Sequence, residues 1–172
     1  VLDLLSKNTG KKIEFYMPTS YSSVVEALLG KWVDIAVLGP ESYLIAKSQG
    51  AVIDVFATYY KKKDGIQEAG PGFKSILITK KGSKFTSIES VKGSVMLLVD
   101  PASTSGSLIP ESQFGGKVIK TPLKSYFSKV AFSGGHDLST LAVFDGKADA
   151  GFVATHRFMN AITASKGKMK LD

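Results

Sequence analysis

Apolar residues in the first half of the chain recur with two different periods. Between residues 21 and 29 they fall at helical spacing, with Thr19 or Ser20 as a cap in front and Gly30 behind, which predicts an amphipathic helix. Elsewhere they alternate with polar residues or form short unbroken runs, which are typical of strands. We expect strands at residues 12–17, 33–38, 52–60 and 73–79, and further helices at 1–8 and 41–49.

The second half of the chain shows the same alternation of elements. We expect strands at residues 95–99, 126–132 and 148–153, with a further short strand within 117–124, and helices at 87–91, 108–114, 137–144 and 155–165. Gly115 and Gly116 are expected to end the helix at 108–114. Strands and helices that alternate in this way predict an α/β fold with a mostly parallel sheet.

A polar stretch near residue 80 and a faint internal echo predict two lobes. Residues 20–38 and 135–153 each run from a cap through a helix to Gly-Lys, an aspartate and an apolar strand. We therefore divide the chain into a first α/β lobe at 1–80, a crossover at 81–84 and a second α/β lobe at 85–172. In such sheets the ligand lies beyond the carboxyl ends of the strands, here in a cleft between the lobes.

The segment Asp100-Pro-Ala-Ser-Thr-Ser-Gly-Ser107 is the main candidate for chemistry. It joins a predicted buried strand to a predicted helix and carries three consecutive hydroxyls, Ser103, Thr104 and Ser105. The start of a helix offers free N–H groups and a partial positive charge, and hydroxyls add donors. The segment predicts an oxyanion cradle, although one such hydroxyl in an ordinary helix cap would serve structure alone.

Composition narrows the function classes. The 172 residues contain 44% hydrophobic residues, no cysteine, two histidines and a net charge of +7. We expect no metal site, no cofactor and no cysteine nucleophile, and the motifs of serine hydrolases, phosphate-loop enzymes and zinc peptidases are absent. The lysines are scattered rather than gathered with aromatics, so we expect a binding protein with no nucleic-acid partner rather than an enzyme.

Several motifs in order along the chain resemble one family. They are residues 21–29 followed by Val33-Asp-Ile-Ala-Val-Leu-Gly-Pro-Glu-Ser-Tyr43, Gly72-Phe-Lys-Ser-Ile-Leu-Ile-Thr79, the cradle segment, and Phe132-Ser-Gly-Gly-His-Asp137 with Gly146-Lys-Ala-Asp149. Together they resemble the PhnD-like substrate-binding proteins that serve ABC importers of phosphonate, phosphite and related phosphorus oxyanions.

The resemblance implies a type II periplasmic-binding-protein fold, with its first strand and its returning crossover outside this sequence. It also implies a ligand held by the residues Tyr21, Ser103, Thr104, Ser105 and His136. Phe73 and His156 are further candidates for lining the pocket, and Arg157 is a weaker one. The implied partners are a small phosphorus-containing anion and an ABC transporter permease. The protein is expected to be a monomer located in the periplasm or lipid-anchored outside a Gram-positive cell.

One departure from the family bears on the ligand. Where binders of aminoalkylphosphonates carry a carboxylate for the amine, this chain has Thr155-His156-Arg157, so we expect a ligand without an amine. Three alternatives stay open: the ligand-binding domain of a signalling receptor, a binder of a larger organophosphate such as a thiamine phosphate, and an enzyme acting on a phosphoester.

Overall fold

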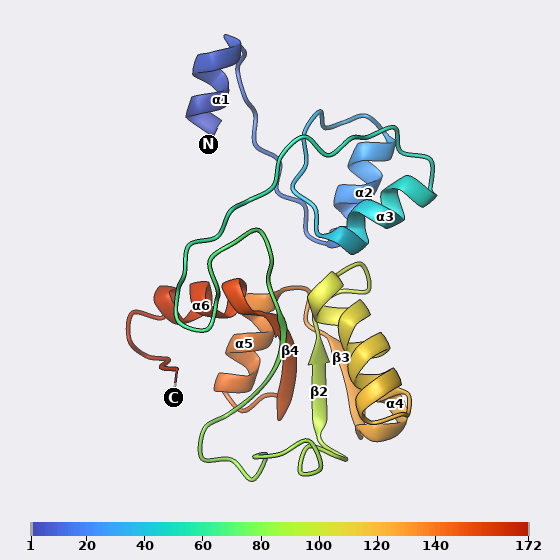
Figure 1. Ribbon diagram of the computed structural model, residues 1–172, viewed down its shortest axis with the longest axis vertical. Helices are drawn as coiled ribbons and strands as arrows, with labels where there is room; N and C mark the ends of the chain where they lie inside the picture. Colours follow the sequence, from blue (N-terminus) through green and yellow to red (C-terminus); the bar gives the residue numbers. More distant parts are fainter. Residues whose placement is uncertain (1, 172) are drawn as a thin grey trace.

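The computed structural model describes residues 2–171 and contains two parts (Figure 1). The N-terminal part carries α1 (Leu2–Thr9), α2 (Tyr21–Leu29) and α3 (Pro40–Ser48). The C-terminal part is built on a sheet of four strands, which are β1 (Ser75–Thr79), β2 (Val95–Leu98), β3 (Lys129–Phe132) and β4 (Ala150–Ala154). The predicted helices at 1–8, 21–29 and 41–49 are confirmed to within a residue or so, except that residue 1 lies outside the described residues.

The sheet has the strand order β1-β4-β2-β3. β2 is parallel to both β3 and β4, and β1 is antiparallel to β4. The carboxyl ends of the three parallel strands therefore meet at one edge of the sheet, where ligands bind in open α/β folds. In Figure 1 this edge faces the N-terminal part.

Helical segments cover both faces of the sheet. They are η1 (Thr104–Leu108), η2 (Pro110–Val118), α4 (Leu123–Tyr126), α5 (His136–Phe144) and α6 (Thr155–Ala164). Strand residues alternate between the two faces: Met96 and Leu98 pack in one cluster with residues of η2 and α4. Val95 and Leu97 pack in the other cluster, with residues of α5 and α6. The predicted α/β layering is thus present in the C-terminal part.

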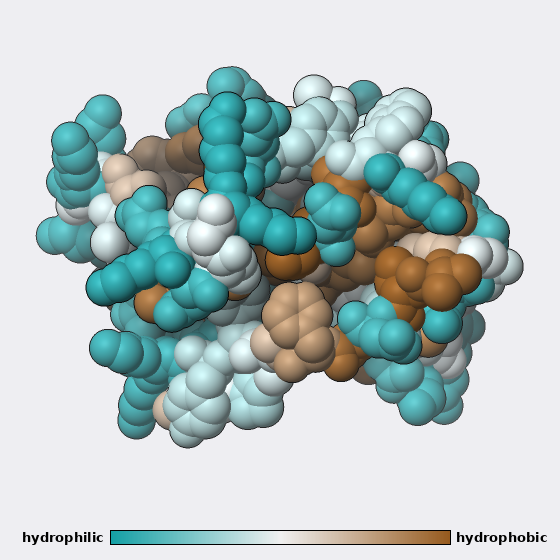
Figure 2. Space-filling view, turned by 90° about the horizontal axis from the view of Figure 1, so that it is seen from above, coloured by the Kyte–Doolittle hydropathy of each residue, from teal (hydrophilic) through white to brown (hydrophobic). Residues whose placement is uncertain are grey.

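The predicted strands at 12–17, 33–38 and 52–60 are wrong, because the structure gives these segments no strand. Their apolar side chains lie largely in solvent, with Met17 75%, Val52 95% and Phe56 75% exposed. Alternating sequence predicts an extended backbone, but a strand also needs a neighbour to pair with, and none of the described residues provides one here. Figure 2, which looks onto this part, shows brown apolar side chains among the charged ones.

The segment after the cradle also differs from its prediction. The expected α-helix at 108–114 is replaced by the π-helical segments η1 and η2, and Gly115 and Gly116 lie inside η2 rather than ending it. Hydrogen bonds five residues apart mark this winding, as in Leu108 N–H to Ser103 O at 3.1 Å. Residues 117–124 form no strand, and residues 87–91 form turns rather than a helix.

The position of β1 bears on the division into lobes. A first lobe at 1–80 would include β1, yet β1 pairs with β4 from Ser75 opposite Ala154 to Thr79 opposite Ala150. We therefore propose that the crossover between the lobes lies ahead of β1, within residues 61–74, rather than at 81–84.

Candidate functional site

Helix starts from both parts of the molecule lie around the cradle segment. The Tyr21 N–H at the start of α2 points to Oδ2 of Asp100 at 3.4 Å, and the Glu41 N–H in the first turn of α3 donates to Oγ1 of Thr104 at 2.9 Å. Thr104 itself begins η1. Since each helix start carries partial positive charge, three such charges lie at the cradle.

Two further helix starts meet beside it. α5 begins at His136, and α6 begins after Ala154, whose N–H donates to Nδ1 of His136 at 3.2 Å. Because Nδ1 accepts this bond, the proton of the neutral imidazole is on Nε2. Burial, aided by the nearby Arg157 and His156, lowers the pKa of His136 to about 4. At neutral pH His136 is therefore an uncharged donor through Nε2.

The three hydroxyl residues of the cradle are held in place by different bonds. Oγ of Ser103 accepts the Gly106 N–H at 3.1 Å, and Thr104 accepts from α3 as described. The carbonyl of Ser105 accepts from the hydroxyl of Ser75 in β1 at 2.7 Å. Ser103 and Ser105 are buried and Thr104 is half-buried. A hydroxyl oxygen that accepts a bond keeps its own hydrogen for another partner, so the cradle retains donor capacity.

Tyr21 joins the N-terminal part to this site. Burial raises the pKa of its phenol, while a hydrogen bond with the Ser103 side chain and the charge of Arg157 oppose that rise. The phenol is thus protonated at neutral pH and lies within reach of the cradle. Asp100 and Asp137 also act on Tyr21, and Asp100 is satisfied by the Ala102 N–H at 2.8 Å.

Phe73 and His156 form an aromatic wall next to the start of α6. Their rings meet edge to face, with centroids 5.0 Å apart and planes at 62°. Nζ of Lys61 lies over the Phe73 ring, 5.2 Å from its centre, which is a cation–π distance. Burial and the charges of Lys61 and Arg157 lower the pKa of His156 to about 4, so this imidazole is also neutral at pH 7.

A loop at residues 61–72, which we call the strap, places Lys61 and leads into Phe73. It is closed by pairing of Lys61 with Gly70 and fastened by the buried Gln67. The Gln67 amide donates to the Gly72 carbonyl at 3.1 Å, and its oxygen accepts from the Thr155 hydroxyl at the start of α6. The strap is therefore fixed to the same helix start that carries His156.

The structure thus arranges the predicted site residues in two groups. Ser103, Thr104 and Ser105 lie within the cradle segment, and Tyr21 and His136 lie at the helix starts beside it. Phe73 lies with His156 on the wall. Sequence reasoning missed Lys61 and Gln67, which belong to a polar loop. The hydrogen bond that joins this loop to α6, from Thr155 to Gln67, links residues 88 apart in sequence. No local pattern signals such a contact.

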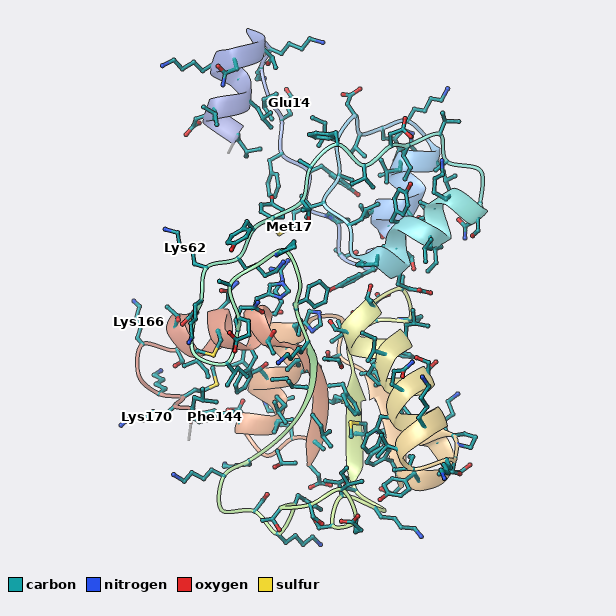
Figure 3. All side chains as sticks on the ribbon, in the orientation of Figure 1. Glu14, Met17, Lys62, Phe144, Lys166 and Lys170 are labelled. Carbon is teal, nitrogen blue, oxygen red and sulfur yellow. The ribbon has the colours of Figure 1, made fainter. Side chains whose placement is uncertain are left out.

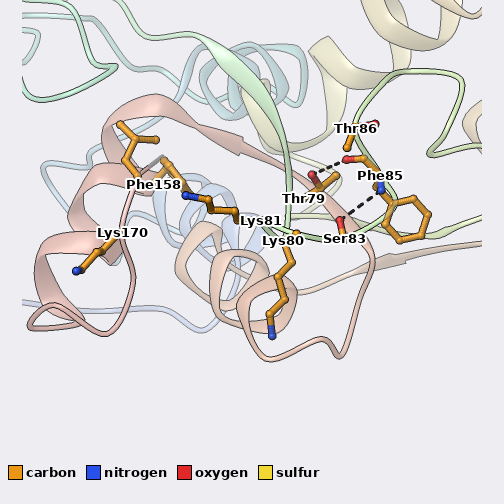
Figure 4. A pocket seen from close by; sticks show the side chains of 10 residues that line it. Thr79, Lys80, Lys81, Ser83, Phe85, Thr86, Phe158 and Lys170 are labelled. Atoms are coloured by element: carbon orange, nitrogen blue, oxygen red, sulfur yellow. Dashed lines mark hydrogen bonds between the residues drawn. The ribbon is translucent and has the colours of Figure 1, made fainter.

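Other features lie away from this site. A pocket of about 440 Å³ between the end of β1 and the end of the chain is lined by Lys80, Lys81 and Lys170 among others (Figure 4). Since β1 runs against the parallel strands, this pocket lies at the opposite edge of the sheet from the cradle. Within residues 2–171 no group of three or more potential ligands is placed to hold a metal, and no helix has both the length and the apolarity to cross a membrane.

Comparison with known proteins finds relatives that are substrate-binding proteins for phosphonate or phosphate import. The family model described as "ABC transporter, phosphonate, periplasmic substrate-binding protein" matches residues 1–171. A curated relative, the phosphate-import protein PhnD of Mycolicibacterium smegmatis, is 31% identical over 175 residues, covering 99% of this chain and 53% of the relative. The chain therefore spans about half the length of that relative.

Solved structures agree on the fold. A binding protein component of an ABC phosphonate transporter from Pseudomonas aeruginosa has a TM-score of 0.84 at 25% identity, covering 96% of this chain and 53% of that one. PhnD1 from Prochlorococcus marinus, solved in complex with methylphosphonate, has a TM-score of 0.73 at 23% identity, covering 96% and 60%. The predicted periplasmic-binding-protein fold is confirmed, and the chain belongs to the family of phosphonate-type periplasmic substrate-binding proteins of ABC transporters.

Proposed function

We propose that this protein captures a phosphorus oxyanion outside the cytoplasm and delivers it to an ABC importer. The observation that carries the proposal is the meeting of helix starts and hydroxyls at the cradle. The starts of α2 and α3 bond to the cradle segment at Asp100 and at Thr104, where η1 begins. Those of α5 and α6 meet at His136. Membership of the family and the phosphate- and phosphonate-related relatives support the same class of ligand.

The proposed binding step replaces the water around the anion with protein donors. Hydroxyls of Ser103, Thr104 and Ser105, Nε2 of His136 and the phenol of Tyr21 would donate to the oxygens of the ligand, and charge-assisted bonds of this kind are the stronger ones. Tyr21 comes from the N-terminal part and His136 from the sheet-bearing part. A ligand that engages both would draw the two parts together, and the permease would recognise that closed form.

The surroundings of the wall support a ligand without an amine. Lys61 and Arg157 are the charges that act on His156, and no carboxylate is among them. An ammonium group at this point would meet like charge, which disfavours binding. Phosphate, phosphite, hypophosphite and methylphosphonate are the candidates that this reasoning favours over aminoethylphosphonate.

The test is thermal unfolding of the intact protein with a ligand panel of phosphate, phosphite, hypophosphite, methylphosphonate, aminoethylphosphonate and sulfate. A bound ligand at about 100 times its dissociation constant stabilises the folded state by about 2.7 kcal/mol, which gives a clear rise in melting temperature. We expect such a rise with at least one phosphorus oxyanion that lacks an amine. If none of the phosphorus oxyanions shifts the transition, the proposed function is wrong.

A further inference from the structure

The wall formed by Phe73 and His156 has properties that the cradle does not explain. His156 belongs to the first turn of α6, and Phe73 follows the strap. Ala154, two residues before His156, donates its N–H to Nδ1 of His136, so the wall lies next to that histidine. A ligand whose oxyanion occupied the cradle would direct its remaining substituent toward neighbouring side chains of this kind. The chemistry of the wall therefore bears on which substituent is accepted.

Two cations flank the wall, and neither forms an ion pair with a carboxylate in the described part of the chain. Nζ of Lys61 donates to the Pro71 carbonyl at 3.2 Å while it lies over the Phe73 ring. Arg157 follows His156 directly in α6 and is exposed. The carboxylates near the site, Asp100 and Asp137, act on Tyr21 on the cradle side. The charged groups that act on the wall are thus all cations, whereas those that act on the cradle side include both cations and carboxylates.

One buried polar atom of the wall is also left without a partner. Nδ1 of His156 is buried and has no hydrogen bond within the described residues. Buried polar groups are nearly always paired, so an unpaired one requires an explanation. A ligand group that brought a hydrogen-bonding atom to this edge of the imidazole would supply the missing partner.

We propose that Lys61 and His156, which both contact Phe73, form with Arg157 a subsite for a second acidic group on the ligand. This inference rests on the proposed function, because it takes the cradle as the place of the phosphorus oxyanion. The ligand class it names is a small phosphonate or phosphate ester that also carries a carboxylate or a second anionic oxygen. Arg157 has the planar pair of donors that suits a carboxylate, and Lys61 adds a point charge.

The test compares three phosphonates that differ in one substituent, by titration calorimetry on the intact protein. We expect phosphonoacetate to bind more tightly than methylphosphonate, and 2-aminoethylphosphonate to bind most weakly. Arg157→Gln should weaken phosphonoacetate by about 10-fold or more, the loss expected for one charge-assisted bond, while methylphosphonate changes much less. Lys61→Gln should act in the same direction with a smaller effect.

Lys62→Gln is the matched control, because Lys62 is an exposed neighbour in the same strap whose side chain extends outward (Figure 3). It should leave the ratio of the two dissociation constants unchanged. If methylphosphonate binds but phosphonoacetate binds no better, or if Arg157→Gln weakens both ligands equally, the second subsite is wrong and the proposed function stands. If neither these three ligands nor phosphate, phosphite or hypophosphite binds, both are wrong.

Discussion

Ser103 has two roles, and two measurements on a single variant can tell them apart. Its oxygen caps η1 by accepting the Gly106 N–H at 3.1 Å, and its hydrogen is available to Tyr21 or to a ligand. Ser103→Ala should therefore cost about 1 kcal/mol of folding free energy through the lost cap. It should also weaken binding of the best oxyanion by about 10-fold or more through the lost bond to a charged ligand. Urea unfolding and titration calorimetry measure the two effects.

The control for this change is Ser112→Ala in η2. The Ser112 hydroxyl is exposed and donates to the Leu108 carbonyl at 2.7 Å, so it has no part in the cap of η1. Removal of this hydroxyl should leave affinity unaltered. Unchanged affinity in Ser103→Ala would remove Ser103 from the proposed ligand contacts, whatever happened to stability.

His136 makes folding stability depend on pH in a defined direction. Its pKa is about 4 in the folded protein and 6.5 in an unfolded chain, so the unfolded state binds more protons between these values. Its contribution to stability is fully present above pH 6.5, falls as the pH drops toward 4, and amounts to about 3 kcal/mol. Unfolding free energies measured across this range should fall less steeply for His136→Gln than for the unaltered protein.

His156→Gln provides the comparison for the histidine prediction. The pKa of His156 is lowered to about 4 as well, but this side chain is more exposed than His136. Solvent screening therefore makes its share of the pH dependence smaller. Parallel pH profiles for His136→Gln and the unaltered protein would contradict the buried neutral state assigned to His136.

At the scale of elements, η1 packs tightly against Val99, the residue that follows β2. A Cβ atom added at Gly106 would lie 2.4 Å from side-chain atoms of Val99 and 2.9 Å from Oγ of Ser103. Gly106→Ala must therefore push η1 away from the strand, at a cost of about 1–3 kcal/mol. Because η1 carries the cradle, affinity for the oxyanion should fall together with stability, as calorimetry and urea unfolding would record.

Gly116→Ala in η2 separates the steric effect from a general effect of glycine replacement. At Gly116 the nearest atom to an added Cβ is the Glu111 carbonyl oxygen at 3.9 Å, an ordinary contact. This variant should keep the affinity and lose little or no stability. Equal behaviour of the two variants would show that the tight contact at Gly106 does not position the cradle.

The elements also show what the sequence could predict and why. The helix at α2 and the buried strands β2 and β4 follow from local periodicity and caps, and so does the cradle as a strand-to-helix turn. The π-helical winding of η1 and η2 could not be predicted, because it depends on hydrogen-bond register rather than on apolar spacing. The hydrogen bond between Thr155 and Gln67 could not be predicted either, since it joins segments far apart in sequence.

At the scale of the whole molecule, the two parts differ in how completely their apolar side chains are buried. The sheet-bearing part has two apolar clusters that cover both faces of the sheet. The N-terminal part has one small cluster around Val25, Ala46 and Ala51, and its extended segments leave large apolar side chains in solvent. Exposed apolar surface of this kind is typical of surfaces that bind another protein, a ligand or a membrane, or that aggregate.

Trp32 offers a direct test of that exposure, because it is the chain's single tryptophan and lies 78% exposed just after α2. In the 172-residue chain its fluorescence should resemble that of a hydrated indole and should be quenched efficiently by acrylamide. The far-ultraviolet circular dichroism of the same sample serves as the control that the helices and the sheet are formed. A blue-shifted, poorly quenched emission in a folded sample would mean that Trp32 is covered. Either the extended segments would then fold back onto α2, or copies of the chain would associate through their apolar side chains, and a dependence of the emission on concentration would separate these two cases.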